Sequence, residues 1–357
     1  MENLILERKI ISCKDFSRLK YISLAVDRTV VNDTAQNRQS HSFEVANTIE
    51  LINSMISEKL GFDIDPLKVG RSIGLLHDIG HMAKGHVGEK TLNRFVQFYS
   101  EGTISYESNS NNFIKLQKNK LFEGLSNKVK RYVLASLAKH PEELYPELSY
   151  VKKYIQIETK KELKYLKKHM LITNLDSTIQ CQIMDIADEI SYTISDIVDS
   201  TNVLSKKELI SIFKKELDFE TYLILKKTIG NKSNFRKELD KIYFLFIDNY
   251  TINKNGEVIY INKNIENLKR KLAFISKKYL LKSKIILDIR DKEIEILEEV
   301  FSFYFKNNTE LSSKFYNKKL KFAKNDKDII KIKRDFLAGI TDKGLSKELK
   351  RIRELSL

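Results

Sequence analysis

The segment from Leu75 to Glu89, LLHDIGHMAKGHVGE, contains three of the six histidines of the chain, an adjacent His-Asp pair and a glutamate. Imidazole and carboxylate groups are ordinary ligands of divalent metal ions, and water bound to such an ion becomes a nucleophile near neutral pH. An isolated His-Asp pair also occurs in solvated polar turns, so the pair needs support from elsewhere. With further ligands from other segments, this composition indicates a metal-dependent hydrolase.

Two other segments supply such ligands. His41 begins a stretch in which apolar residues recur at helical spacing, namely Phe43, Ala46, Ile49, Ile52 and Met55. Farther along, QIMDIADEISYTISDIVDS predicts a helix with an apolar stripe of Ile183, Ala187, Ile190, Ile194 and Ile197 and a polar stripe of Asp185, Asp188, Tyr192, Asp196 and Asp199. Carboxylates are rarely buried unless they are paired or bind a metal. The polar stripe therefore either faces solvent or lines a cationic site.

These segments give one candidate ligand set, His41, His77, Asp78 and Asp188, delivered by three helices. On a regular helix the side chains of neighbouring residues diverge by about 100°. His77 and Asp78 can thus reach one ion only near a helix end, and the three glycines that follow, up to position 88, fit such an end. The nitrogen and oxygen ligands suit Mn²⁺, Fe²⁺, Co²⁺, Ni²⁺ or Mg²⁺. A structural zinc site is disfavoured because no cysteine lies near the set.

The order His41, His77-Asp78, Asp188, with GHxGE after the His-Asp pair, resembles the HD-domain deoxynucleoside triphosphate triphosphohydrolases, of which the dGTP enzymes are the type members. Four segments carry the resemblance along nearly the whole chain. RKIISCKDFSRLKY is similar to the family's RxRIxxSxAFRRLKYKTQV, NRQSHSFEV to RTRLTHSLEV, ADEISYTISDIVD to ADDIAYxxHDLED, and RDFLAGITDK to DYIAGMTDRYA. We therefore identify the chain as a member of this family.

The resemblance implies that water attacks the α-phosphorus and releases a nucleoside and intact triphosphate. In that family's pattern His86 matches the catalytic histidine and Glu89 the residue that orients it; their spacing permits contact on one helical turn. Arg38 matches an arginine that binds phosphate, and Tyr192 and Asp196 match residues that contact the sugar. His81 shapes the pocket in this interpretation. The family also implies a homo-oligomer and single-stranded DNA as a possible regulator.

Two departures from the family pattern concern the substrate. MAKGH replaces the family's PPFGH, so Lys84 is a new cation at the pocket rim that either contacts phosphate or points to water. The glutamine that reads guanine in the dGTP enzymes falls on Leu24, which favours hydrolysis of several dNTPs. If the short segment before His41 shifts the alignment, Gln36 or Gln39 takes that role instead and dGTP is preferred.

The composition of the 357 residues predicts a mostly α protein, because only three prolines and twelve glycines interrupt long amphipathic stretches. The expected fold is an HD-domain helical hydrolase with a small β-hairpin and a helical C-terminal subdomain. TINKNGEVIYI, residues 251–261, predicts the hairpin around Asn255-Gly256. We place the catalytic core at residues 1–245 and assign residues 246–357 to a subdomain that contributes to the pocket and to oligomer contacts.

The net charge of +15 and two lysine-rich runs, residues 152–168 and 263–284, suit either a polyanionic partner or solvated helix faces. Two cysteines cannot form a disulfide framework, and the sequence has neither a signal peptide nor an apolar run of membrane-spanning length. We expect a reduced, cytoplasmic protein without a membrane segment.

Two other functions account for part of the pattern. Another HD phosphohydrolase, acting on a nucleoside monophosphate, a cyclic dinucleotide or an alarmone, explains the ligands but not the N-terminal segment or RDFLAGITDK. A regulatory, nucleic-acid-binding HD protein explains the positive charge, but the GHxGE pair argues against an inactive site. The products released from dNTPs distinguish the enzymes, and salt-dependent DNA binding without hydrolysis would indicate the regulator.

Overall fold

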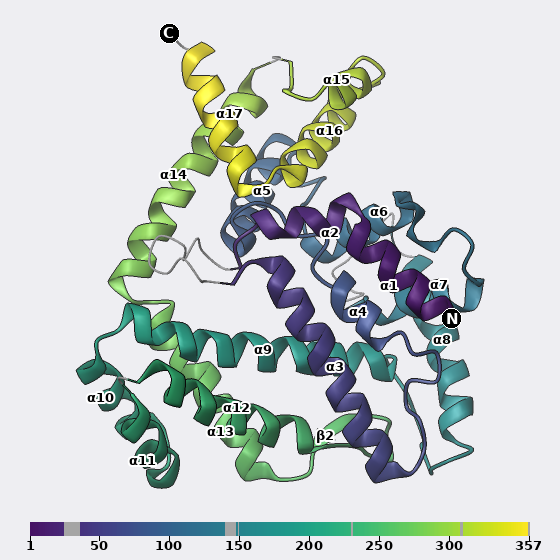
Figure 1. Ribbon diagram of the computed structural model, residues 1–357. Helices are drawn as coiled ribbons and strands as arrows, with labels where there is room; N and C mark the ends of the chain where they lie inside the picture. The colour runs from purple at the N-terminus through teal and green to yellow at the C-terminus, as the bar shows by residue number, and fades with distance from the viewer. Residues whose placement is uncertain (25–35, 140–147, 149, 230, 308–309, 356–357) are drawn as a thin grey trace.

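The structure is a computed structural model that describes residues 1–24, 36–139, 148, 150–229, 231–307 and 310–355. Helices dominate these residues, as the sequence predicts (Figure 1). The elements are α1 (Glu2–Ser12), α2 (Lys14–Arg18), η1 (Leu19–Tyr21), α3 (Arg38–Leu60), α4 (Gly70–Leu76), α5 (Gly85–Tyr99), α6 (Ser108–Lys118), η3 (Lys120–Phe122), α7 (Asn127–Ser136), α8 (Tyr150–Leu166), α9 (Ile179–Val203), α10 (Lys206–Glu216), α11 (Phe219–Thr228), α12 (Lys232–Asp248), β1 (Tyr250–Ile252), β2 (Val258–Tyr260), α13 (Lys263–Ile275), η5 (Ser276–Leu280), α14 (Lys284–Lys306), α15 (Lys314–Leu320), α16 (Asp326–Gly339) and α17 (Asp342–Leu355).

Three helices, α3, α4 and α9, form the centre of the molecule, and α9 crosses α3 (Figure 1). Helix α3 begins at a capping box in which the Asn37 side chain accepts from the Ser40 amide, and it ends at Gly61 in the left-handed conformation. The apolar stripe predicted for α9 is buried along its whole length. In the polar stripe, Asp196 and Asp199 are buried, Asp185 and Asp188 are half-buried, and Tyr192 is exposed, so this stripe borders both the interior and solvent.

The close approach of α3 and α4 depends on a glycine. A Cβ atom at Gly74 of α4 would lie 2.6 Å from the Cα atom of Ala46 on α3, so no larger residue fits without separating the two helices. Helix α4 stops at Leu76, and His77 caps its C-terminal end. The sequence-based expectation that the His-Asp pair lies at a helix end is therefore confirmed.

The predicted β-hairpin is present. Strands β1 and β2 pair in antiparallel register, with Tyr250 opposite Tyr260 and Ile252 opposite Val258. Gly256, in the connecting turn, has a φ of 75°, a left-handed conformation that favours glycine. The hairpin packs against α3 and α9 and so extends the central core.

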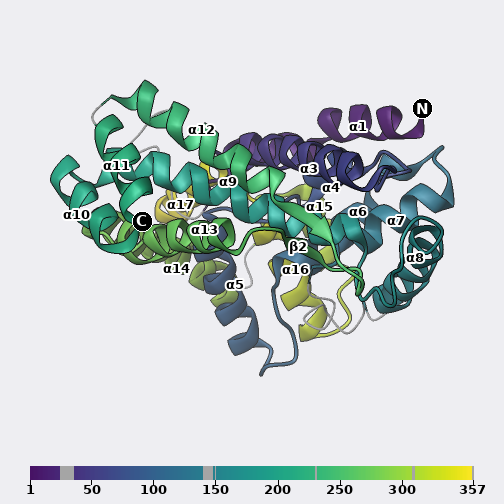
Figure 2. The same cartoon turned by 90° about the horizontal axis from the view of Figure 1, so that it is seen from below.

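The hydrophobic core has two parts. The larger cluster runs from Leu6 to Ile275 and includes the hairpin. The smaller cluster joins α5 to the C-terminal helices, through contacts of α5 with α14 and α16 and of α14 with α17. Figure 2 shows α5 and α16 on the side of the molecule that faces away from α3 and α12. The division of the chain after residue 245 stays a prediction.

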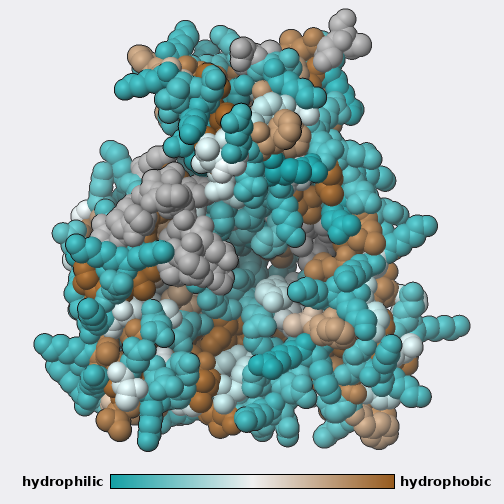
Figure 3. All heavy atoms as spheres, turned by 180° about the vertical axis from the view of Figure 1, so that it is seen from behind, coloured by the Kyte–Doolittle hydropathy of each residue, from teal (hydrophilic) through white to brown (hydrophobic). Residues whose placement is uncertain are grey.

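Hydrophilic side chains cover most of the face shown in Figure 3. All seven lysines of the run 152–168, namely Lys152, Lys153, Lys160, Lys161, Lys164, Lys167 and Lys168, are exposed. This run is a solvated helix face in the structure. Within the described part of the chain, no helix combines the length and the apolar character needed to cross a bilayer.

Candidate active site

His41, His77 and Asp188 converge from α3, the end of α4 and α9. One ligand atom from each of these residues lies within 4.8 Å of the other two. His41 Nε2 is 2.9 Å from Asp188 Oδ1, and His77 Nε2 is 3.7 Å from the same oxygen. Both histidines are nearly inaccessible to solvent, so the cluster lies in a protected position between the three helices.

The tautomer of His77 is set by the backbone of its own helix. Its Nδ1 atom lies 2.6 Å from the carbonyl oxygen of Gly74, which can only accept a hydrogen bond. In the neutral ring Nδ1 therefore carries the proton, and the lone pair of Nε2 is directed toward Asp188 and His41. Burial acts to lower the pKa of His77, but Asp78 and Asp188 raise it above its usual value, so the two carboxylates favour positive charge at this position. Nε2 of His77 is buried and has no hydrogen-bond partner among the described residues. A buried lone pair facing a second imidazole and a carboxylate fits a divalent metal ion.

Asp78, the fourth predicted ligand, lies beside this cluster. Its Oδ1 is 3.5 Å from His77 Nε2 and 3.1 Å from His81 Nε2, and its Oδ2 is 2.6 Å from Arg38 Nη1. Burial acts to raise the pKa of Asp78, but Arg38 and then His77 oppose it and hold that pKa well below the usual range. One carboxylate oxygen thus faces the imidazoles while Arg38 orients the other. Its place in the ligand shell stays a prediction.

Lys139 is a residue of this site that sequence reasoning missed. Its ammonium group donates to Asp188 Oδ2 at 2.7 Å and lies 3.1 Å from Asp185 Oδ1. Burial acts to lower the pKa of Lys139, but Asp188 and Asp185 raise it above its usual value, so the side chain is charged. Lys139 balances the negative charge of the polar stripe and orients Asp188. No motif around residue 139 indicates this contact.

The glycine-rich turn brings together a second group, His81, His86 and Glu89, whose ligand-type atoms lie within 4.8 Å of one another. Glu89 Oε2 lies 3.3 Å from His86 Nδ1, and Glu89 Oε1 accepts from the backbone amide of Ser108 at 3.0 Å. Burial acts to raise the pKa of Glu89, but the hydrogen bond from His86 and the proximity of His81 lower it to about 2. Glu89 is thus ionised at neutral pH.

His86 is placed for proton transfer. Its side chain is 66% exposed, and the ring of His81 meets it edge to face at 5.4 Å. Because the Glu89 carboxylate can only accept from Nδ1, the other ring nitrogen, Nε2, is left to exchange a proton. The sequence-based pairing of His86 with Glu89 on one helical turn agrees with this geometry, and their catalytic roles stay predictions.

The three predicted substrate-binding residues differ in exposure and in their distance from the cluster, since Asp196 lies about two helical turns beyond Asp188 on α9. Arg38 is buried, and besides Asp78 its Nη2 donates to the Leu24 carbonyl oxygen at 2.8 Å. Tyr192 is 40% exposed, and burial together with Glu189 raises its pKa to about 12, so the phenol is neutral. Asp196 is buried and accepts from the hydroxyl of Ser276 in η5. Only Tyr192 of the three presents a large solvent-accessible surface.

Lys84 does not point to bulk water, which was one of the two alternatives for it, and its contact with phosphate stays a prediction. The side chain is buried, and its ammonium group lies 3.2 Å from Glu293 Oε1 on α14. The charge of Lys84 is therefore directed toward the C-terminal helices. A buried ammonium group requires a compensating charge, and Glu293 supplies it from the C-terminal helices.

The candidates for base selection are only partly described. Leu24 is half-buried, and residues 25–35, which follow it, lie outside the described residues. The amide of Gln36 is engaged on both sides, since its nitrogen donates to Glu44 and its oxygen accepts from Ser195 at 3.1 Å. Gln39 is half-buried on the first turn of α3.

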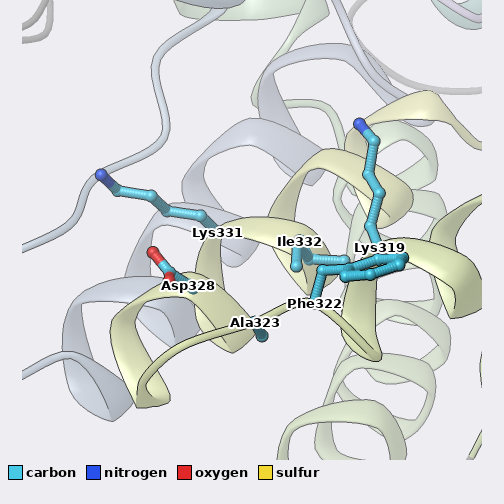
Figure 4. Close-up of a pocket in the computed structure, with 6 residues that line it drawn as sticks. All are labelled: Lys319, Phe322, Ala323, Asp328, Lys331 and Ile332. Atoms are coloured by element: carbon cyan, nitrogen blue, oxygen red, sulfur yellow. The ribbon is translucent and has the colours of Figure 1, made fainter.

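Two cavities formed by described residues differ in their relation to the site. A cavity of about 320 Å³ lies on the C-terminal helices and includes none of the predicted residues; Figure 4 shows its lining, Lys319, Phe322, Ala323, Asp328, Lys331 and Ile332. A polar cavity of about 200 Å³ borders α3, α9 and α12, with Gln36, Ser195 and Tyr243 in its wall. The second cavity shares α3 and α9 with the cluster of His41, His77 and Asp188. The lining of the first cavity includes no residue of that cluster.

Comparisons with known proteins agree with the geometry. The HD domain family matches residues 38–193, the range that holds His41, His77 and Asp188. The chain is 26% identical to a deoxyguanosinetriphosphate triphosphohydrolase-like protein of Rickettsia typhi, an alignment that covers 94% of this chain and 87% of the relative. Proteins of the same name from Geobacter metallireducens and Rickettsia peacockii are 25% and 26% identical over 97% and 94% of this chain, and each is covered to 87%. The family resemblance found in the sequence is confirmed.

Proposed function

We propose that the chain is an HD-domain phosphohydrolase of the deoxyguanosinetriphosphate triphosphohydrolase-like family and that it hydrolyses deoxynucleoside triphosphates to a deoxynucleoside and inorganic triphosphate. Its match to the HD domain family over residues 38–193 and its nearly full-length similarity to proteins of that name support the proposal. The observation that carries the proposal is the position of His77 Nε2, which is buried and faces His41 and Asp188 where three helices meet. In the part of the chain that the structure describes, this atom has no hydrogen-bond partner. The relatives' name supplies the class of substrate.

His41, His77, Asp188 and Asp78 would hold one divalent ion, of Mn²⁺, Mg²⁺, Fe²⁺, Co²⁺ or Ni²⁺ type. Such an ion supplies a Lewis acid for a phosphate oxygen and lowers the pKa of bound water. The mixed imidazole and carboxylate donors match this group of metals, and the two free cysteines of the chain, Cys13 and Cys181, are not among them. Asp78 and Asp188 each keep one oxygen on a cation, Arg38 or Lys139, which fixes the direction of the other oxygen.

The remaining residues bind substrate and move the proton. In the proposed reaction a water oxygen bonds to the α-phosphorus, the bond from phosphorus to the sugar oxygen breaks, and a proton passes to that oxygen. Nε2 of His86 is the group of the site best placed for proton transfer, and ionised Glu89 holds the ring through Nδ1. Tyr192, neutral and partly exposed, would pack on the sugar.

The decisive experiment incubates the purified chain with each dNTP in Mn²⁺ or Mg²⁺ and separates nucleoside from triphosphate. Intact triphosphate supports the proposal, whereas orthophosphate or pyrophosphate indicates another HD phosphohydrolase. Binding of DNA that weakens with salt, without hydrolysis under any of the metals, would indicate a regulatory protein.

Helix α9 offers a matched pair of variants for the same assay. Asp188 and Asp185 both contact Lys139, but only Asp188 lies with His41 and His77. Asp188→Asn should therefore abolish metal binding and turnover, while Asp185→Asn should retain both. Equal loss in the two variants would show that the charge balance around Lys139, and not ligation, accounts for the effect.

A further inference from the structure

The C-terminal motif RDFLAGITDK, residues 334–343, contributes no side chain to the cluster of His41, His77 and Asp188. One residue of the motif nevertheless contacts the glycine-rich turn that precedes His86. Asp342 is the first residue of α17, and its two carboxylate oxygens accept from two backbone amides that are remote in sequence. Oδ1 accepts from Lys84 at 2.7 Å, and Oδ2 accepts from Ser23 at 2.9 Å. One carboxylate thus connects α17 to the glycine-rich turn and to the N-terminal segment. In Figure 1, α17 begins beside α5 and runs away from it toward the C-terminus.

The contact with Lys84 holds a strained backbone. Lys84 has a φ of 62° and precedes Gly85 at 50°, so two consecutive left-handed residues begin α5. A non-glycine residue adopts this conformation only where surrounding contacts enforce it. Asp342 holds the Lys84 amide, and Glu293 holds its ammonium group. His86 lies two residues after Lys84, so this turn sets the direction of its imidazole.

The contact with Ser23 acts on the other side of the site. Ser23 pairs with Asn37 as an isolated β-bridge, and the next residue, Leu24, accepts from Arg38 through its carbonyl oxygen. The same carbonyl oxygen also lies close to the glycine-rich turn, since a Cβ atom added at Gly85 would be only 1.9 Å from it. The N-terminal segment and the glycine-rich turn are therefore in backbone contact, and Asp342 holds both.

We infer that Asp342 is a positioning residue that does not touch substrate. It fixes the position of His86 through the backbone of Lys84. It fixes the position of Arg38 through the backbone of Ser23 and Leu24. The catalytic consequence rests on the proposed function. The C-terminal helices then complete the site by holding its two backbone segments together, which gives the RDFLAGITDK motif a physical role.

The test compares Asp342→Asn with Asp328→Asn in the full chain. Asp328 also lies in the first turn of a C-terminal helix and accepts from a backbone amide, that of Lys324. Among the described residues it makes no hydrogen bond to residues 20–24 or 82–88, so it serves as the matched control. Asparagine keeps the shape of Asp342 but can accept through only one oxygen. Amide hydrogen exchange of residues 20–24 and 82–88 is measured together with metal content, kcat and KM.

For Asp342→Asn we expect faster exchange in at least one of the two segments, unchanged metal content, and a loss in kcat of about tenfold to a hundredfold with little change in KM, the cost of a displaced catalytic group. Asp328→Asn should match the wild type in all four measurements. If the Asn variant does not unfold cooperatively, Asp342→Glu, which keeps two acceptor oxygens, is used, and a smaller loss in kcat is expected.

Unchanged exchange in both segments would overturn the inference, and so would faster exchange with kcat within about twofold of the wild type. If the wild-type chain has no activity on any dNTP, the proposed function fails, but hydrogen exchange still decides whether Asp342 fixes the two segments.

Discussion

Glu162 makes the stability of this protein depend on pH at the start of the helix that carries Asp188. Its Oε1 accepts from the hydroxyl of Tyr132 at 2.7 Å, and its Oε2 accepts from the amide of Ile179, the first residue of α9, at 3.0 Å. Burial raises the pKa of Glu162 from its ordinary value of 4.5 to about 7, although both hydrogen bonds oppose the shift. The folded protein therefore binds this proton more tightly than the unfolded chain does.

The sign and size of the effect follow from linkage. A carboxyl group whose pKa is raised on folding contributes stability below pH 4.5, and that contribution is lost as the pH rises to about 7. Each pKa unit corresponds to about 1.4 kcal/mol, so the free energy of unfolding should fall by about 3 kcal/mol across this window. Glu162→Gln keeps an uncharged side chain of the same shape at every pH and should remove this dependence.

The assay is urea unfolding of the wild type and of Glu162→Gln at intervals between pH 4.5 and 8, with the difference in unfolding free energy followed against pH. Other titrating groups, including the histidines, cancel in the difference. Glu295→Gln, an exposed position on α14, is the control and should parallel the wild type. Parallel profiles for the wild type and Glu162→Gln would show that Glu162 titrates normally and would refute the argument.

Three further predictions concern the candidate site. Asp78→Ala should lose both metal and turnover, and near-normal metal content by elemental analysis would remove Asp78 from the ligand shell. His86→Ala should keep metal and substrate affinity but lose about two to four orders of magnitude in rate, the usual scale for a general acid or base. The control is His169→Ala, because His169 is exposed and stacked on Phe62. Wild-type turnover in His86→Ala would contradict the assignment. The native chain should hydrolyse several dNTPs, because leucine at position 24 offers guanine no hydrogen bond. Leu24→Gln should narrow the substrate preference toward dGTP. If the native chain strictly prefers dGTP and Leu24→Gln leaves that preference unchanged, Leu24 does not read the base.

The sequence was sufficient for features that depend on local periodicity. The apolar stripe of α9, the helical stretch after His41 and the hairpin around Asn255-Gly256 follow from spacing and turn chemistry alone, and the structure has all three. The ligand types also indicated their own convergence, because buried imidazoles and carboxylates on three helices need a common partner. The position of His77 at a helix end followed from the geometry of adjacent residues.

Tertiary structure alone decided which charges meet. Lys139 contacts Asp188 across 49 residues, and the Ser23 amide donates to Asp342 across 319. Lys84, which the sequence predicts at the pocket rim, pairs with Glu293 on α14. No periodic pattern marks such contacts, because helical periodicity specifies which face of a helix is buried but not which side chain of another helix lies opposite. The partner is set by how the helices pack, and in this chain that packing also places Asp342 against the glycine-rich turn that carries His86.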